Sequence, residues 1–128
     1  MEVLKSLQNG DCFKLTIDYK LDTWNDTINH CRNNRYGANN RKKKEMQLIK
    51  SFLRGVPKVE RYPIKLICYW HVRNMASDLD NKSLKAVLDA MQETGIIEND
   101  NCKHIKEIVY KSVKDERDYL EIEIVLPD

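Results

Sequence analysis

Two aspartates one residue apart, Asp78 and Asp80, have the plainest chemical potential in this sequence. A strand is expected just before them and a helix just after. The pair should therefore lie in an extended junction, with both carboxylates projecting to one side. Two like charges held together are unfavourable unless a cation lies between them. Since hard divalent ions such as Mg²⁺ prefer carboxylate oxygens, the pair is a candidate metal clamp.

A plainer interpretation of the same residues is also open. Asp80 would serve only as a helix N-cap, and Asp78 would be a solvated loop carboxylate. The spacing of the two aspartates alone favours this interpretation over a metal clamp. An EF-hand calcium loop begins with the same pattern, but Lys82 and Ser83 stand where that loop needs an acid and a glycine. We therefore exclude an EF-hand.

Two further features favour the metal. Lys85 lies one helical turn after Asn81, where its ammonium group could stabilise charge on a scissile phosphate or position an attacking water. An ion pair with Asp89, four residues further on, is the alternative role for this lysine. Asp100 lies in the polar turn 98–101 beyond the helix. The next strand can bring that turn back to complete the metal shell, although a polar turn alone also explains it.

The elements that must position these residues alternate along the chain. Two periodic apolar stripes predict helices, one from near Arg41 to Gly55 and one from Asp80 or Asn81 to about Thr94. The order β-α-β-α-β-β predicts an α+β domain with a mixed sheet and two main helices. Four segments predict the strands: 13–19, 64–72, 105–113 and 119–126. The first alternates apolar with polar residues, whereas 64–72 is partly apolar on both sides, as in the interior of a sheet.

Composition limits the classes of protein that remain. A length of 128 residues indicates one domain, at 12–128, with 1–11 as a candidate disordered segment. Neither a run of about 18 apolar residues nor an apolar leader occurs, so we expect no membrane span and no secretory signal. The four cysteines are dispersed without a CxxC pair, which favours a reduced cytoplasmic compartment.

Charge is distributed unevenly along a chain whose net charge is only +2. Residues 31–58 carry nine basic side chains against one acid, Glu45, a net +8 that leaves −6 on the rest. The stretch 20–40, which overlaps the start of this basic segment, is polar and predicts a long loop before the basic helix. Such a segment suggests an anionic polymer as partner, with a solvated helix face as the alternative.

Three consecutive motifs carry a family resemblance. They are Asp-Leu-Asp-Asn at 78–81, Lys-Ala-Val-Leu-Asp-Ala-Met at 85–91, and Gly-Ile-Ile-Glu-Asn-Asp-Asn at 95–101. In this order they resemble the RusA-like Holliday-junction resolvases of bacteria and their phages. The resemblance covers about 14–126, and an upstream stretch rich in Asn and Arg also fits it.

The resemblance implies a RusA-like fold and a homodimer that nicks two opposed strands of a four-way DNA junction with Mg²⁺, for which Mn²⁺ is an expected substitute. It assigns the metal to Asp78, Asp80 and Asp100, and a catalytic role to Lys85. It implies a phage or prophage gene expressed in the bacterial cytoplasm, and no membrane partner. Candidate DNA contacts are Asn25, Arg32, Arg35, Arg41, Lys42, Lys43, Lys44, Arg73 and Lys82.

The sequence also departs from the family pattern. Asn99 stands where a second acid is common; its amide oxygen could still ligate the metal, with less charge, and Asn99 and Asn81 are otherwise candidates for a supporting place around the metal. The helix lysine falls one residue later than in the best-known member, so Lys82 competes with Lys85 for the catalytic role. Two alternative functions stay open: a non-catalytic nucleic-acid-binding module of the same fold, and a broader nuclease for flaps and other branched DNA.

Overall fold

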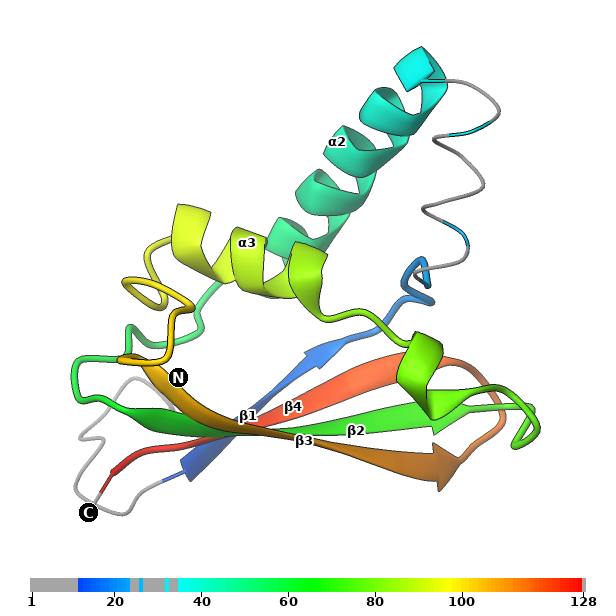
Figure 1. Cartoon of the computed structure of the whole chain (residues 1–128). Coiled ribbons are helices and arrows are strands. Elements are labelled where there is room, and N and C mark those ends of the chain that lie inside the picture. The colour runs from blue at the N-terminus through cyan, green and yellow to red at the C-terminus, as the bar shows by residue number, and fades with distance from the viewer. Residues whose placement is uncertain (1–11, 24–25, 27–31, 33–34, 128) are drawn as a thin grey trace.

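A computed structural model describes residues 12–23, 26, 32 and 35–127 of the protein. The candidate disordered segment 1–11 lies outside them. The predicted α+β order is confirmed, with one additional 3-10 turn (Figure 1). The elements are β1 (Cys12–Ile17), α2 (Arg35–Phe52), β2 (Ile64–Val72), the 3-10 helix η2 (Leu79–Asn81), α3 (Lys85–Glu93), β3 (Ile105–Lys114) and β4 (Tyr119–Val125).

The four strands form one mixed sheet in the order β1-β4-β2-β3. β2 pairs in parallel with β3, and β4 is antiparallel to both β1 and β2. Ile64 pairs with Ile105, and Val72 pairs with Lys114, so β2 and β3 run side by side over their whole length. The segment between these parallel strands, which contains η2 and α3, must therefore return from one end of the sheet to the other.

The core lies between one face of the sheet and the two helices (Figure 1). Alternate residues of β2 are buried from Ile64 to Val72, while the intervening residues stay partly exposed on the face that no described helix covers. From α3, Val87 and Met91 are fully buried against the sheet. None of the described helices is both long and apolar enough to cross a membrane.

Both helices begin at residues other than those predicted. α3 begins at Lys85 and not at Asp80, because residues 79–81 form a separate 3-10 turn. α2 begins at Arg35, six residues before the predicted start at Arg41. The prediction missed its first turns because they are polar and carry no apolar periodicity. The end of α3 agrees with the prediction: Gly95 adopts a φ of 80° and terminates the helix.

Candidate metal and DNA site after the central strand

The segment that carries the aspartate pair leaves the sheet at a firmly held point. The backbone N–H of Asp115 donates to the carbonyl of Val72, at 3.0 Å. The N–H of Arg73 donates to a carboxylate oxygen of Asp118, at 2.9 Å, and Lys114 Nζ donates to the Arg73 carbonyl. These bonds tie the exit of β2 to the turn between β3 and β4, so the following residues start from a fixed position.

A compact turn then delivers Asp78. The Asn74 side chain accepts a hydrogen bond from the N–H of Ala76, at 2.9 Å, and the Asn74 carbonyl accepts one from the Ser77 hydroxyl, at 2.8 Å. Asp78 itself is extended, with φ −81° and ψ 121°, and its carbonyl accepts from the N–H of Asn81 to close η2. Short-range polar bonds therefore shape the loop, and Leu79 packs against the core beside it.

Asp78 and Asp80 are both exposed. Neither carboxylate has an ion pair or a side-chain hydrogen bond with another residue in the described part of the chain. The predicted orientation of the pair needs correction, because Asp80 lies within the 3-10 turn and not in an extended strand. Strand alternation therefore does not direct both side chains to one side. The plainer N-cap role is also wrong for α3, whose N-cap is Leu84.

Two lysines follow the pair. Lys85, in the first turn of α3, pairs with Asp89 at 3.6 Å, as its alternative role predicted, and its side chain is 67% exposed. Lys82 is partly exposed and has no ion pair with a described residue. An exposed pair such as Lys85–Asp89 contributes little to stability, so Lys85 can leave it for a phosphate at small cost.

Asp100 lies far from the aspartate pair within one chain. Its turn is fixed at the start of β2, where the N–H of Ile64 donates to the carbonyl of His104 and the N–H of Glu98 donates to the Tyr62 hydroxyl. η2 lies at the other end of the sheet (Figure 1). A nine-residue strand such as β2 spans roughly 26 Å between its end residues.

The predicted three-aspartate site is therefore not assembled in a single copy. No group of three or more acidic, thiol or imidazole side chains suited to a metal occurs within residues 12–23, 26, 32 and 35–127. Asn99 serves its own turn, since its side-chain oxygen accepts from the N–H of Asn101 at 3.0 Å. Asn81 lies next to Asp80, and its supporting place around a metal stays a prediction.

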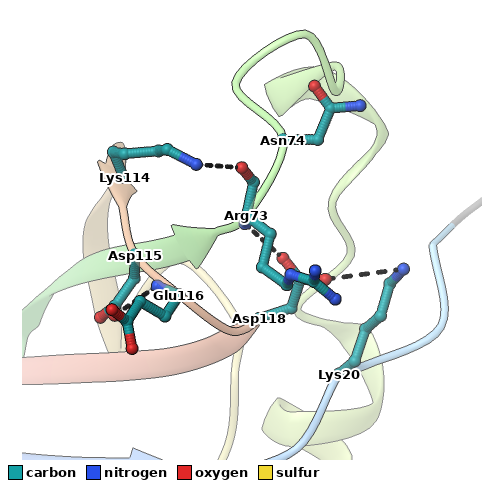
Figure 2. Close-up of a pocket in the computed structure, with 7 residues that line it drawn as sticks. All are labelled: Lys20, Arg73, Asn74, Lys114, Asp115, Glu116 and Asp118. Carbon is teal, nitrogen blue, oxygen red and sulfur yellow. Dashed lines mark hydrogen bonds and ion pairs between the residues drawn. The ribbon is translucent and has the colours of Figure 1, made fainter.

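The predicted DNA contacts that the structure describes fall into three places, of which one is Lys82, between η2 and α3. Arg73 lines an open pocket of about 970 Å³ at the exit of β2 (Figure 2). Its guanidinium has no ion pair with a described residue, so it is free to take a phosphate. The basic segment supplies the third place: Arg32 and 41–44 are exposed. Asn25 and the side chain of Arg35 lie outside the residues that the structure describes.

The remaining residues of this open pocket are charged or polar and come from three segments of the chain: Lys20, Asn74, Lys114, Asp115, Glu116 and Asp118. Lys20 Nζ lies 3.6 Å from a carboxylate oxygen of Asp118. The pocket is therefore a mixed-charge surface in which Arg73 is the cation with an unengaged side chain.

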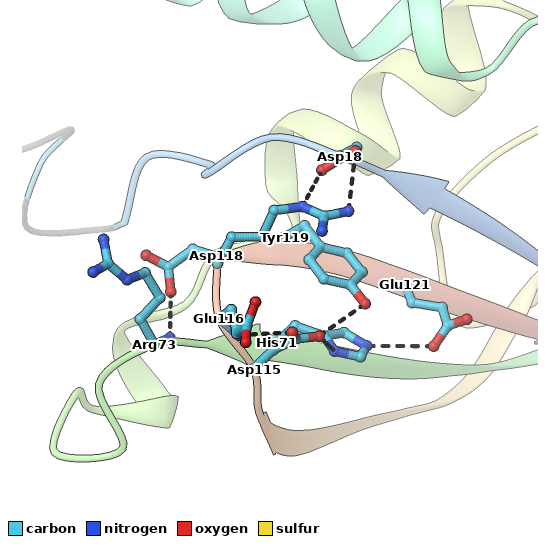
Figure 3. A network of polar contacts seen from close by, with 9 residues as sticks. Asp18, His71, Arg73, Asp115, Glu116, Asp118, Tyr119 and Glu121 are labelled. Atoms are coloured by element: carbon cyan, nitrogen blue, oxygen red, sulfur yellow. Dashed lines mark hydrogen bonds and ion pairs between the residues drawn. The ribbon is translucent and has the colours of Figure 1, made fainter.

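A histidine network beside this pocket was not found from the sequence (Figure 3). The ring of His71 stacks on Tyr119 with centroids 4.0 Å apart. Its Nδ1 lies 3.0 Å from Asp115 and its Nε2 lies 3.4 Å from Glu121. The network ties β2 to β4 and to the turn that holds Arg73. Finding it requires the pairing of His71 with Tyr119, which no local pattern reveals.

The carboxylate of Asp115 is stabilised in its ionised form. The N–H of Glu116 donates to it at 2.7 Å, and the hydroxyl of Tyr119 donates at 3.1 Å. Chiefly through the bond from Glu116, and with help from Tyr119 and His71, these groups hold the pKa of Asp115 below its ordinary value. Asp115 therefore stays charged as a structural anchor at neutral pH.

A second cavity, of about 210 Å³, lies between α2 and α3 and was also missed. Glu45, half buried at its wall, accepts a hydrogen bond from the N–H of Asp22 at 3.0 Å. Burial is the main cause that raises the pKa of Glu45. The cavity is lined by Asp22, Lys42, Glu45, Met46, Ser83, Lys85, Ala86 and Asp89.

Comparison with known proteins adds no relative to this picture. No protein-family profile and no curated protein matches the sequence.

Proposed function

We propose that this protein is a Mg²⁺-dependent endodeoxyribonuclease that resolves four-way DNA junctions. One observation supports it above the others. Asp78 and Asp80 stand exposed just beyond the central strand, and no described cation neutralises them. Exposed carboxylates without a described protein partner are available to a hard divalent ion. The resemblance of the three motifs then supplies the substrate class.

The chemistry of the donor set fits a hard divalent ion. Asp78 and Asp80 would hold the ion through carboxylate oxygens, and water would fill further positions, as Mg²⁺ prefers. When bound, the ion supplies Lewis-acid polarisation of the scissile phosphate and activates water for hydrolysis. Mn²⁺ is expected to substitute for it.

The protein's own groups would bind and orient the phosphate. Lys85 would leave its exposed pair with Asp89 and place its ammonium beside the charge that develops on phosphorus. Arg73 would hold a flanking phosphate from the pocket at the exit of β2. Lys82, which lies between the aspartates and α3, is the competing candidate for the role of Lys85.

A homodimer gives Asp100 a place in this proposal. Within one copy Asp100 lies at the opposite end of the sheet from Asp78 and Asp80, so it would complete the metal site only from a second copy. A two-fold dimer would also present two such sites to a substrate with two-fold symmetry, which suits paired cuts on opposed strands.

A cleavage assay on a mobile four-way junction with Mg²⁺ tests the proposal, with nicks mapped on all four strands. We expect symmetric paired nicks. Comparable cutting of a plain duplex would instead indicate the broader branched-DNA nuclease.

The Asp80→Asn variant makes the test specific. We expect cleavage to disappear, because a metal ligand loses its charge. Junction binding should persist or tighten, because repulsion between this carboxylate and phosphate falls. Gel-shift and cleavage assays measure the two properties separately. Asp89→Asn is the matched control: it removes a nearby carboxylate outside the aspartate pair and should leave cleavage within a few-fold of the wild-type rate.

The second candidate function is a non-catalytic DNA-binding module. The observation that favours it is the lack of an assembled three-carboxylate site among the described residues of one copy. It predicts no metal-dependent cleavage by the wild-type protein and no change in DNA binding for Asp80→Asn.

A further inference from the structure

The first half of α2 is a helix that the rest of the described protein does not cover. Residues 40–44 are all exposed, and five consecutive residues exceed one helical turn. These residues are therefore largely open to solvent, although Arg41 pairs with Asp22 and Lys42 lines the cavity between α2 and α3. Figure 1 shows this half of α2 extending away from the sheet, while the other end of the helix crosses α3.

Packing does not account for this free-standing turn. Only the far end of α2 reaches the core, where Ile49 is fully buried and Leu53 follows just after the helix. A helix that is polar on all sides gains little from tertiary contacts, and a short helix alone is marginal in water. This turn is linked to the rest of the protein by a bidentate ion pair. The Arg41 guanidinium donates two hydrogen bonds to the Asp22 carboxylate, at 2.9 and 3.0 Å.

The charge on this turn is unbalanced. Lys42, Lys43 and Lys44 follow one another, and none has an ion pair with a residue in the described ranges. Three consecutive lysines without an anionic partner leave this turn strongly positive. The turn is therefore complementary in charge to a polyanion.

The directions in which the three lysines project restrict the shape of a polyanion that could contact all of them. Successive helical residues are turned by about 100°, so Lys42, Lys43 and Lys44 span about 200° of the circumference. A partner lying against one side of the helix would leave at least one of them facing away. A partner with phosphates on two sides would meet all three. The DNA major groove has this form, since it is about 12 Å wide and admits a helix between two phosphate backbones.

We infer that α2 inserts into a groove of duplex DNA, with Lys42, Lys43 and Lys44 bound to phosphates on both of its walls. The inference rests on the proposed function for the choice of DNA, and it adds where and how a duplex arm is held. Lys42 also lines the cavity between α2 and α3 together with Lys85. A DNA arm gripped by α2 would therefore pass beside the start of α3, next to the segment that carries Asp80.

Salt-dependent binding of three single variants tests the inference. Lys42→Ala, Lys43→Ala and Lys44→Ala each remove one charge and keep a strong helix former. Binding of fluorescent duplex and four-way junction is measured in EDTA across a range of salt concentrations. We expect each variant to reduce the slope of log K against log salt by about 0.9, the value for one lost phosphate contact. Lys106→Ala, an exposed lysine on the edge strand β3, is the matched control and should leave the slope unchanged.

Two results would overturn the inference. A normal slope for one or two of the three variants would mean that DNA lies on one side of α2. Normal slopes for all three would mean that α2 binds another partner. Far-UV circular dichroism checks that helix content is retained, and a Lys→Gln series repeats the test for any variant that loses it. Because EDTA removes the metal, binding can succeed here while the nuclease proposal fails in the cleavage assay.

Discussion

The two lysines that follow the aspartate pair are held differently. Lys85 has an exposed ion pair with Asp89, whereas Lys82 has no ion pair with a described residue. We expect Lys85→Ala to lower the single-turnover cleavage rate by about 100-fold, because a group that stabilises transition-state charge is lost. The free energy of unfolding should change by less than about 0.5 kcal/mol, because the pair is exposed. Quench-flow cleavage and urea unfolding measure the two effects.

Lys82→Ala is the comparison that decides between the two lysines. A larger loss of rate for Lys82→Ala than for Lys85→Ala would transfer the catalytic role to Lys82. Asp89→Ala removes the partner of Lys85 without removing the ammonium group, and it should leave the rate close to that of the wild type.

Glu45 gives the protein a defined pH dependence. Burial raises its pKa above the ordinary 4.5, so its stabilising contribution is present below that value and is lost as pH rises through the raised pKa. Glu45→Gln does not titrate, and it keeps an oxygen that can accept from the N–H of Asp22. We therefore expect the stability of Glu45→Gln relative to wild type to rise as the pH increases from about 4.5 through the raised pKa. Urea unfolding over this range measures it.

A Glu45→Gln curve that ran parallel to wild type over this pH range would contradict the raised pKa of Glu45.

At the scale of the elements, the attachment of α2 depends on very few side chains. Ile49 is fully buried, and its neighbour Leu48 is 37% exposed. We expect Ile49→Ala to lower the free energy of unfolding by about 2–5 kcal/mol, since it leaves a cavity in the core. Leu48→Ala should cost less than about 1 kcal/mol. Urea denaturation compares the two, and equal losses would mean that α2 is not anchored at Ile49.

The strands could be predicted closely because their pattern is local. β1 and β2 alternate buried with more exposed residues, and β2 runs from Ile64 to Val72 as predicted, although β3 lacks strict alternation. The helix starts could not be predicted equally well. Asp80 has the residue type of an N-cap, yet its own 3-10 turn separates it from α3. The first turns of α2 have no buried side at residues 40–44, so they leave no apolar pattern in the sequence.

At the scale of the whole molecule, the position of Asp100 could not be predicted. It depends on the relative direction of two strands, β2 and β3, and not on a local sequence pattern. The parallel pairing of β2 with β3 requires the chain to return along α3 before β3 begins. That return carries the turn of Asp100 to the start of β2, away from Asp78 and Asp80. The sequence could suggest the residue types of the candidate metal site, but not their distribution between two ends of the sheet.

Mixed dimers test whether two copies share one site. Asp80→Asn and Asp100→Asn should each be inactive alone, since each removes a ligand from both sites of a homodimer. If a site combines Asp80 of one copy with Asp100 of the other, a mixed dimer has one site with both substitutions and one intact site. We therefore expect co-expression of the two variants to restore cutting, as single nicks in place of paired ones. If all ligands came from one copy, neither site of the mixed dimer would be intact. Continued inactivity of a mixed dimer verified by mass spectrometry would therefore reject the shared site.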